Sequence, residues 1–517
     1  MSIKQSHIIK KGYYGLESII LTLAFMALCR IKNPEQLKQC APGEMGKLIG
    51  LDRVPEIKCL RNKMNELFKN NKTEAWNQIL AKQWIDTTKE DCFLYTDGHV
   101  RIYNGYLANP TKKFVSRQKL CLSATTDFWL NDSQGMPLLV FTGVLSEKLQ
   151  HMIEDVMLPD LFSSGILPKD YKGDKPICTL IFDREAYDPA FFIRLWKVYR
   201  IAIITYRKNV KDKWDLQDFK SMAVVDNMNA EKTMQLCEKK TTLSGHTFRE
   251  IRSLSDNDHQ TAIITTHPTL IITVIAVTMF NRWVQENFFK YMIADYNLNH
   301  ITQYGVEPID PNKEVVNPHY RSIKYQIKKE KEKLSRLKAK LLAVVKLNSE
   351  AKIDQYTISI KSGAALVEQI EVKQTLILQL ENKKSEIPDK IKISEMPENQ
   401  KYSNLKTESS YFMATLKMIC YRAETATANL LNGNYSRYIE EKRMLLKNLI
   451  TTPIDMSPDY HNNTLTIKLH SLNTPRANKS ITELCQILNE SETIFPGTNL
   501  KIIYKTMAIK TAVSQEF

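Results

Sequence analysis

The sequence predicts an α/β protein with a helical N-terminal region and a basic coiled-coil hairpin. Three observations support this prediction. Short apolar runs between residues 92 and 210 alternate with a segment of helical spacing, which is typical of a sheet covered by helices. Residues 16–29 are apolar nearly all round, as in a buried helix. Apolar residues also recur at heptad spacing from 323 to 344 and from 366 to 387.

These patterns divide the 517 residues into six segments. A chain of this length holds roughly two to four domains. We expect an N-terminal helical region that is a candidate for DNA binding (1–90), the first part of a sheet core (91–207), a β-rich segment (208–266), a helical return to the core (267–319), the coiled-coil hairpin with a linker (320–400), and a C-terminal helical and mixed region (401–517).

The composition points to a polyanionic partner. Lys and Arg number 72 against 57 Asp and Glu, a net charge of +15. This excess suits nucleic acid or an acidic membrane surface and does not choose between them. The nine cysteines are scattered singly without a C-x-x-C pair, which favours reduced thiols in a cytoplasmic protein over a disulfide framework or a zinc site.

Two apolar runs are candidates for membrane-spanning segments. Residues 19–29 and 270–280 are each 11 residues long. A membrane span needs roughly 18–20 residues. We therefore expect two buried helices and no membrane partner.

A helix-turn-helix is one interpretation of Pro42–Lys69. A short helix is followed by a break at Gly50 and by a second helix entered through Pro55. The second helix would carry Lys58, Arg61 and Lys63 toward DNA. The alternative is a helical hairpin that only packs.

Two predicted strands end on a carboxylate. The run "CFLYTD" reaches Asp97, where a turn at Gly98 is expected, and "ICTLIFD" reaches Asp183. Sites in α/β proteins lie at strand ends, where a rigid scaffold holds side chains at a cleft. Each Asp alone is also typical of a turn or helix cap.

A third carboxylate lies in residues 269–296, for which we expect one long helix. Glu286 has Arg282 four residues before it and Lys290 four residues after it, so the three share a face. A plain ladder of salt bridges is the alternative. Together with Asp97 and Asp183, Glu286 would supply the oxygen ligands of a pair of Mg²⁺ or Mn²⁺ ions.

The hairpin carries much of the positive charge. Arg321–Lys346 contains ten Lys or Arg and two Glu. A solvated helix face and an arm that faces phosphates are both consistent with this run. A break between its two helices is expected near Ser362 and Gly363.

Several stretches together resemble a bacterial insertion-sequence DDE transposase. They are "YTDGHVRIYNG", "SRQKLCLSATTDFWLND", "TLIFDREAYDPAFF" and "NRWVQENFFKY", and the resemblance covers most of residues 12–505. It implies a ribonuclease-H-like mixed sheet core, with a β-rich insertion before the catalytic Glu. It also implies that Asp97, Asp183 and Glu286 are the catalytic residues and metal ligands, with two Mg²⁺ or Mn²⁺ ions expected.

The resemblance further implies cleavage at the ends of a mobile element and strand transfer into target DNA. The implied partners are the terminal repeats and the target DNA, bound by a homodimer, in the bacterial cytoplasm and at the nucleoid when on DNA. Arg282, Lys290 and Arg184 would contact phosphates. Trp214 is a candidate to stack on a flipped base, or else a packing residue.

Two positions depart from the pattern of this branch. Met279 and Ile293 stand where it has a Tyr and a Lys. They motivate an alternative, a transposase-derived DNA-binding protein without catalytic turnover. A nuclease without strand transfer is a third interpretation. Lower-ranked polar residues are His99, as a contact behind Asp97, and Asp127 and Asp132, for which turns are favoured.

Overall fold

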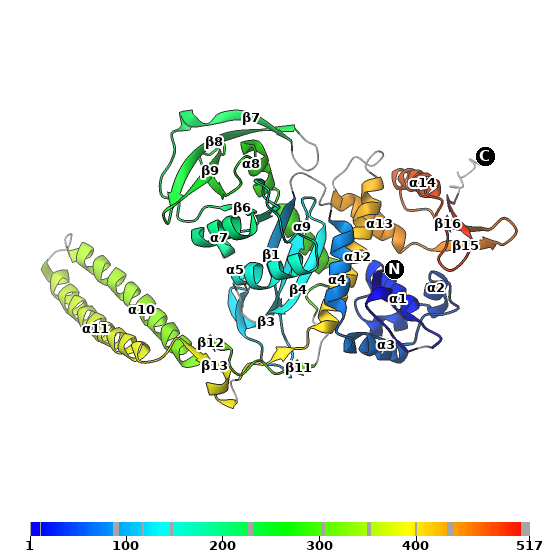
Figure 1. Ribbon diagram of the computed structural model, residues 1–517. Coiled ribbons are helices and arrows are strands. Elements are labelled where there is room, and N and C mark those ends of the chain that lie inside the picture. The colour runs from blue at the N-terminus through cyan, green and yellow to red at the C-terminus, as the bar shows by residue number, and fades with distance from the viewer. Residues whose placement is uncertain are drawn as a thin grey trace, which may run out of the picture. The chain divides into compact units, whose positions relative to one another are not determined.

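The computed structural model describes residues 2–10, 12–85, 92–115, 118–144, 148–225, 231–300, 305–348, 353–398, 401–431 and 439–507. The chain forms two compact units (Figure 1). The larger consists of Met1–Asn104, Thr111–Tyr304 and Lys406–Phe517, and the smaller of Gly105–Pro110 and Gly305–Leu405. In the described ranges, no helix has both the length and the apolar character needed to cross a membrane.

A ten-stranded mixed sheet organises the larger unit, in the order β2-β3-β1-β5-β6-β10-β9-β8-β7 with β4 also paired to β3. Strand β1 is antiparallel to β3, whereas β1, β5 and β6 are parallel to one another. The strands are β1 (Phe93–Ile102), β2 (Lys112–Val115), β3 (Leu120–Asn131), β4 (Pro137–Val144), β5 (Cys178–Ile181), β6 (Ile201–Tyr206), β7 (Lys220–Val225), β8 (Glu231–Leu243), β9 (His246–Leu254) and β10 (Gln260–Thr265).

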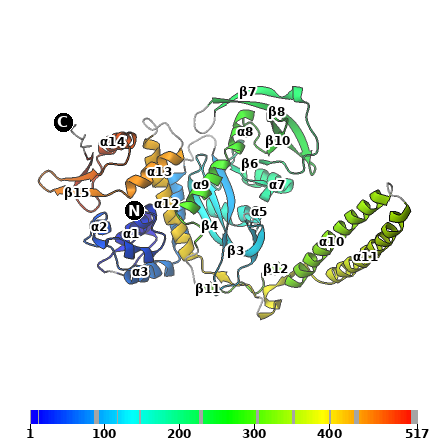
Figure 2. The same ribbon diagram turned by 180° about the vertical axis from the view of Figure 1, so that it is seen from behind.

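The central strands are buried on both faces. Because side chains alternate along a strand, Leu180 and Ile203 pack into one apolar cluster with α5 (Leu149–Met152), α6 (Leu158–Ser163) and α7 (Pro189–Tyr199). The intervening positions, Tyr95, Ile181 and Ile204, pack into a second cluster with α8 (Ile272–Phe280). Figure 2 shows α8 and α7 beside β6 from behind.

Strand β1 is longer than expected. The predicted turn at Gly98 is wrong, since β1 continues to Ile102 and Gly98 pairs with Phe128 of β3. A Cβ atom at residue 98 would lie 3.1 Å from the Phe128 ring. Glycine therefore lets a large neighbouring side chain approach the strand closely, and it does not mark a chain reversal here.

The β-like pieces between 208 and 266 belong to the same sheet. Strand β10 is antiparallel to β6, and β9, β8 and β7 continue outward as antiparallel neighbours. The chain thus extends one edge of the central sheet before it returns through α8.

The single long helix expected over 269–296 is wrong. Helix α8 ends at Phe280, and α9 (Trp283–Ala294) begins after a tight turn at Asn281 and Arg282. The Arg282 N–H donates to the Met279 carbonyl, three residues back instead of four. The two helices pack on different surfaces: Met279 joins the cluster over β5 and β6, and Phe288 joins a cluster with Trp129.

The N-terminal helices share one core with α12 (Glu408–Leu430). They are α1 (Leu16–Leu28), α2 (Pro42–Lys47), α3 (Ile57–Lys69) and α4 (Thr73–Trp84). In the candidate helix-turn-helix, Gly50 has φ of +73° and α3 exposes Lys58 and Arg61, whereas Lys63 donates to the Lys10 carbonyl. This geometry is compatible with both interpretations of the segment.

The C-terminal part adds helices and a small sheet. Helix α13 (Ile439–Ile450) is followed by β15 (Ile454–Asp459), β16 (Thr464–Leu469), α14 (Pro475–Glu490) and β17 (Lys501–Thr506). The three strands form a sheet in which β16 and β17 are parallel. Helix α14 makes the connection between these parallel strands, and it shares an apolar cluster with α12 and α13.

The smaller unit is a hairpin of two long helices on a short base. Helices α10 (Pro318–Asn348) and α11 (Ile353–Ser385) lie side by side (Figures 1 and 2). Ile327, Ile370 and Ile377 are buried between them, as the heptads predict. The break expected near 362–363 is wrong, because α11 runs through it. At the base, β11 (Val306–Glu307) pairs with β14 (Asn404–Leu405), and β12 (Glu314–Val316) pairs with β13 (Lys390–Lys392).

Candidate functional site

The register of the parallel strands brings Asp97 beside Asp183. Tyr95 of β1 pairs with Ile181 of β5, and each Asp follows its paired residue by two positions. A step of two returns a side chain to the same face of the sheet. The backbone at Asp183 is still extended, with φ of −78° and ψ of 176°. Both acids therefore lie on the face that α8 and α9 cover, at neighbouring strands about 4.8 Å apart.

Arg282 lies within ion-pair distance of all three predicted acids. Its Nη1 is 3.7 Å from Asp97 Oδ2, and its Nη2 is 4.0 Å from Asp183 Oδ2. The same Nη2 is 2.5 Å from Glu286 Oε1, one helical turn along α9. Because two of these distances end on one nitrogen, the Asp183 and Glu286 oxygens lie no farther apart than the sum of 4.0 and 2.5 Å. The structure thus brings together residues that are almost 190 positions apart in the chain.

Asp97 is the most enclosed of the three acids. Its side chain is 25% exposed, against 47% for Asp183 and 58% for Glu286. Burial raises the pKa of Asp97 to about 6, and the negative charges of Glu185 and Asp183 act in the same direction. Arg282 and the Gly98 N–H, 2.8 Å from Asp97 Oδ1, oppose this shift. Burial is therefore the main reason why the pKa of Asp97 is raised, and the neighbouring carboxylates add to it.

Glu185 and Tyr206 are two members of the site that were not predicted from the sequence. Burial raises the pKa of Glu185, with Asp183 adding to the shift and Lys113 opposing it. Burial likewise raises the pKa of Tyr206, and the charges of Asp183 and Glu286 contribute. Tyr206 follows Ile204 by two positions, and Ile204 pairs with Ile181. The same two-residue offset that connects the two Asp residues could have identified it.

Gln285 fixes the start of α9 against the sheet. Its side chain is 1% exposed, and its Nε2 donates to Asn131 Oδ1 at 3.0 Å. The same nitrogen lies 3.4 Å from the Tyr95 carbonyl, and the Tyr95 hydroxyl donates to the Thr278 carbonyl at 2.8 Å. Because Arg282 and Glu286 flank Gln285, these bonds hold their side chains over the strand ends.

The predicted phosphate contacts lie at different distances from this cluster. The Arg184 guanidinium lies 5.7 Å from the Tyr206 ring centre, next to Asp183. Lys290 is exposed on α9, one turn beyond Glu286. Trp214 packs on the fully buried Arg252, 4.2 Å from its ring centre, and its backbone bonds to Gln260. Trp214 therefore has a packing role. Because its side chain is only half buried, part of it is also accessible to a ligand.

The lower-ranked polar residues stabilise the surrounding fold. Asp127 lies within β3, so the turn favoured for it is wrong; it forms a buried ion pair with Arg101, with 2.6 Å between Oδ2 and Nε. Asp132 accepts the N–H groups of Gln134 and Met136, so the predicted turn is confirmed. His99 contacts Asn299 at 2.7 Å and stacks on the Phe289 ring of α9.

The donor set suits a hard cation. Carboxylate oxygens without His or Cys are the ligands that Mg²⁺ and Mn²⁺ take. Within the described ranges, no three His, Cys, Asp or Glu side chains stand close enough to hold a metal ion as arranged. Arg282 instead lies between the acids. The Arg282 guanidinium and a divalent cation are alternative ways to place a positive charge among these three carboxylates.

The fold and this cluster define a mixed α/β protein with an acid-rich site where the parallel pairing of β1 with β5 ends. A family model described as "Transposase protein" (Transposase_29) matches residues 4–508. The chain therefore belongs to this transposase family. In comparisons with curated proteins and with solved structures, nothing matched the chain. Membership in this family implies that the protein takes part in DNA transposition and binds DNA.

Proposed function

We propose that this protein is a DDE-type transposase of an insertion-sequence element. It would cleave DNA strands at the element ends and transfer the freed 3′-hydroxyl into target DNA. The observation that carries the proposal is the meeting of Asp97, Asp183 and Glu286 around Arg282. Two of the alternatives are also observed, since Asp183 caps the short helix at Arg184–Ala186 and Glu286 pairs with Arg282. A cap and a salt bridge do not by themselves account for the meeting of all three acids, and that meeting supports the proposal.

The sheet supports the same proposal. Strands β4, β3 and β1 are antiparallel neighbours, and β5 and β6 follow parallel to β1. With β2 counted as a side strand of β3, Asp97 lies on the first core strand and Asp183 after the fourth. This is the placement expected of a ribonuclease-H-like core. Strands β7–β10 would be the β-rich insertion that precedes the catalytic Glu.

Each residue near the cluster has a role in the proposed chemistry. Asp97, Asp183 and Glu286 would hold two Mg²⁺ or Mn²⁺ ions, which activate the attacking oxygen and stabilise the leaving one. Glu185 and Tyr206 border the same position. With the acids neutralised, the Arg282 guanidinium would be available to bind a phosphate oxygen, and Arg184 and Lys290, which neighbour Asp183 and Glu286 in the sequence, would assist.

A second candidate function is DNA binding without turnover. Met279 is fully buried in an apolar cluster, and Ile293 packs against another, so neither offers a polar group to the site. These are the positions where the related branch has Tyr and Lys. The ion pairs of Arg282 with all three acids are also what an idle site would form.

The experiment that separates these functions is a cleavage assay on DNA flanking the gene, with Mg²⁺, Mn²⁺ or EDTA. The active transposase predicts metal-dependent nicking at a defined end, lost in Asp183→Asn. Asp174→Asn, at an exposed acid with the same change in charge, is the matched control and should keep full activity. Binding with no cutting under any metal would favour the second candidate. A cut end that never joins a target would favour a hydrolytic nuclease.

A homodimer on DNA is part of the proposal, because transposition holds two ends together. Light scattering with and without a duplex of the element end would measure it. A complex that contains a single chain at saturating duplex would contradict this part and leave the cleavage chemistry untouched.

A further inference from the structure

Helix α10 has far more positive charge than its partner helix can compensate. Between Arg321 and Lys346 it carries ten Lys or Arg and two Glu, whereas α11 carries four of each sign. A hairpin that served only to pair its helices would gain by placing acids opposite these bases. Two ion pairs link the helices among the residues described, Lys331 with Glu381 and Lys373 with Glu330, both at 2.6 Å.

Four of these bases lie on one face of α10. Arg321, Lys324, Lys328 and Lys331 are spaced by three, four and three residues, which places them in a row about 15 Å long. We name this row the basic stripe. All four side chains are exposed. Like charges at these spacings destabilise a helix, so the arrangement is unfavourable for α10 alone.

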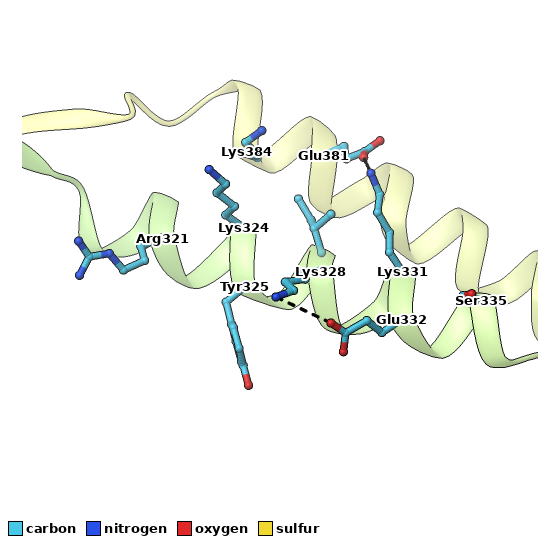
Figure 3. Close-up of a pocket in the computed structure, with 10 residues that line it drawn as sticks. Arg321, Lys324, Tyr325, Lys328, Lys331, Glu332, Ser335, Glu381 and Lys384 are labelled. Atoms are coloured by element: carbon cyan, nitrogen blue, oxygen red, sulfur yellow. Dashed lines mark ion pairs between the residues drawn. The ribbon is translucent and has the colours of Figure 1, made fainter. Parts of the chain in front are cut away.

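The basic stripe borders an open hollow on the hairpin (Figure 3). The hollow measures about 720 Å³, and Lys384 of α11 adds a fifth base to its lining. Two acids, Glu332 and Glu381, also line it, and each pairs with a Lys of the basic stripe. Figure 3 shows Lys324 and Lys331 extending toward α11 and Tyr325 pointing away from it. Within the described ranges, Arg321 and Lys324 have no ion-pair partner.

We propose that the basic stripe binds the phosphate backbone of duplex DNA. The inference rests on the proposed function, in which DNA is the substrate, and it assigns a contact surface outside the acid cluster. Duplex DNA carries one negative charge per about 1.7 Å of its axis, so a row of cations spaced along a rigid helix is complementary to it. A membrane surface would require apolar residues beside the bases. Beside the basic stripe, Ile327 is buried, and Tyr325 is the one large apolar side chain of the hollow's lining that is exposed. A single side chain is less than the apolar face of a membrane-binding helix. The like charges of the stripe would repel the same face of a second copy.

The test compares two variants of the full chain with equal charge removed from the same helix. The stripe variant changes Arg321, Lys324, Lys328 and Lys331 to Ala. The flank variant changes Lys329, Lys333, Arg336 and Lys340 to Ala, on the other side of α10. Ala favours helix, so both variants should keep their circular dichroism. Binding to a 40-base-pair duplex, of element-end or unrelated sequence, is measured by fluorescence anisotropy at several salt concentrations.

We expect the stripe variant to raise Kd at least about tenfold for both duplexes at 100 mM salt. The slope of log K against log salt should fall by roughly two to four, since each lost phosphate contact lowers it by about 0.9. The flank variant should lower the slope by less than about one.

Three results would overturn the inference. Equal losses in the two variants would contradict the assignment to this face, and no loss in either would exclude α10 from DNA binding. Stripe-dependent binding to anionic vesicles, with DNA binding unchanged, would make a lipid surface the partner. A wild-type chain that binds neither duplex would contradict the proposed function itself, which separates its failure from that of the basic stripe.

Discussion

Helix α9 has an arginine–carboxylate cluster at each end, and the two clusters are built differently. At its start, Arg282 is the cation among Asp97, Asp183 and Glu286. Past its end, Glu424 is fully buried, and it is bound by Arg30 at 2.8 Å and by the Tyr296 hydroxyl at 2.6 Å. The Tyr291 hydroxyl also donates to Glu424, and Arg443 lies 3.6 Å away. We call this second group the closed cluster.

The difference between them separates a structural site from a functional one. In the closed cluster, Arg30, Arg443 and two tyrosine hydroxyls surround Glu424, and Asp295 pairs with Arg30 and Lys447, so that every acid there has a cation. These contacts tie α9 to α12 and to the end of α1. Breaking such a buried pair is costly, which is the property of a structural element. At the start of α9 the acids outnumber the cation and are partly open to water. That arrangement opposes folding slightly, and surplus charge in a partly open site is typical of a binding or catalytic position.

A Glu→Gln change at the start of α9 should lower catalytic activity, whereas the same change in the closed cluster should lower stability. The effect on activity should be the larger of the two. Glu286→Gln should lower metal-dependent DNA cleavage by about 10³-fold or more, because a metal ligand is lost. Its thermal unfolding without metal should stay within a few degrees of wild type. Single-turnover cleavage with Mn²⁺ measures the effect, and retained activity would remove Glu286 from the site.

Glu424→Gln should act on stability instead. Removing this charge leaves Arg30 and Arg443 buried beside a neutral amide, which should lower the free energy of unfolding by about 3–5 kcal/mol. Urea unfolding measures it. Cleavage per folded molecule should be near wild type at low temperature. If Glu424→Gln strongly reduced cleavage at normal stability, the closed cluster would have a functional role instead of a structural one.

Asp97→Asn should change how stability depends on pH. The folded pKa of Asp97 is about 6, above the ordinary value of 3.8, so folding favours the protonated acid. This contribution is complete below pH 3.8 and is lost as the pH rises through 6. Asn stays neutral throughout. The variant should match wild type near pH 4 and be more stable by about 1–3 kcal/mol above pH 7 without divalent ions. Urea unfolding from pH 4 to 8 tests this, and parallel curves for the two proteins would contradict it.

The smallest effect expected is from Arg282→Gln. Its acids lose their nearest cation, which should lower stability by about 1–2 kcal/mol at pH 7. Mn²⁺ should restore that loss if it binds the same acids. Arg30→Gln is the matched control, and its destabilisation should not respond to Mn²⁺. Thermal unfolding with and without the metal measures both, and rescue of neither variant would argue against a metal at this site.

Much of this site could be predicted from local sequence patterns. An apolar run that stops at an acid identified Asp97 and Asp183, and the spacing of four identified Arg282 with Glu286. The helix after the β-rich segment was expected in the right region. These features depend on residues within one or two turns or strands, so a single sequence carries them.

The rest depends on contacts between distant residues. Gly98 has the composition of a turn, but the pairing of β1 with β3 keeps it in a strand. The break at Asn281 and Arg282 follows from the packing of α8 and α9 on two separate apolar clusters. Tyr206 joined the site only when the register of β5 and β6 was known. Glu185 joined it only when the short helix at Arg184–Ala186, directly after Asp183, was known. No periodicity in the sequence contains that register.

The register of β1 and β5 also governs how this architecture can change over evolution. Each Asp sits two residues past a paired position, so one inserted residue in either strand would turn its acid to the opposite face. Between Asp183 and Glu286 the chain instead accommodates four more strands at the sheet edge. Insertions and deletions should therefore be strictly excluded from a few residues around Tyr95 and Ile181, and freely accepted in the turns that join β8 to β9 and β9 to β10. A designer who wished to give this scaffold a new specificity would alter those turns first.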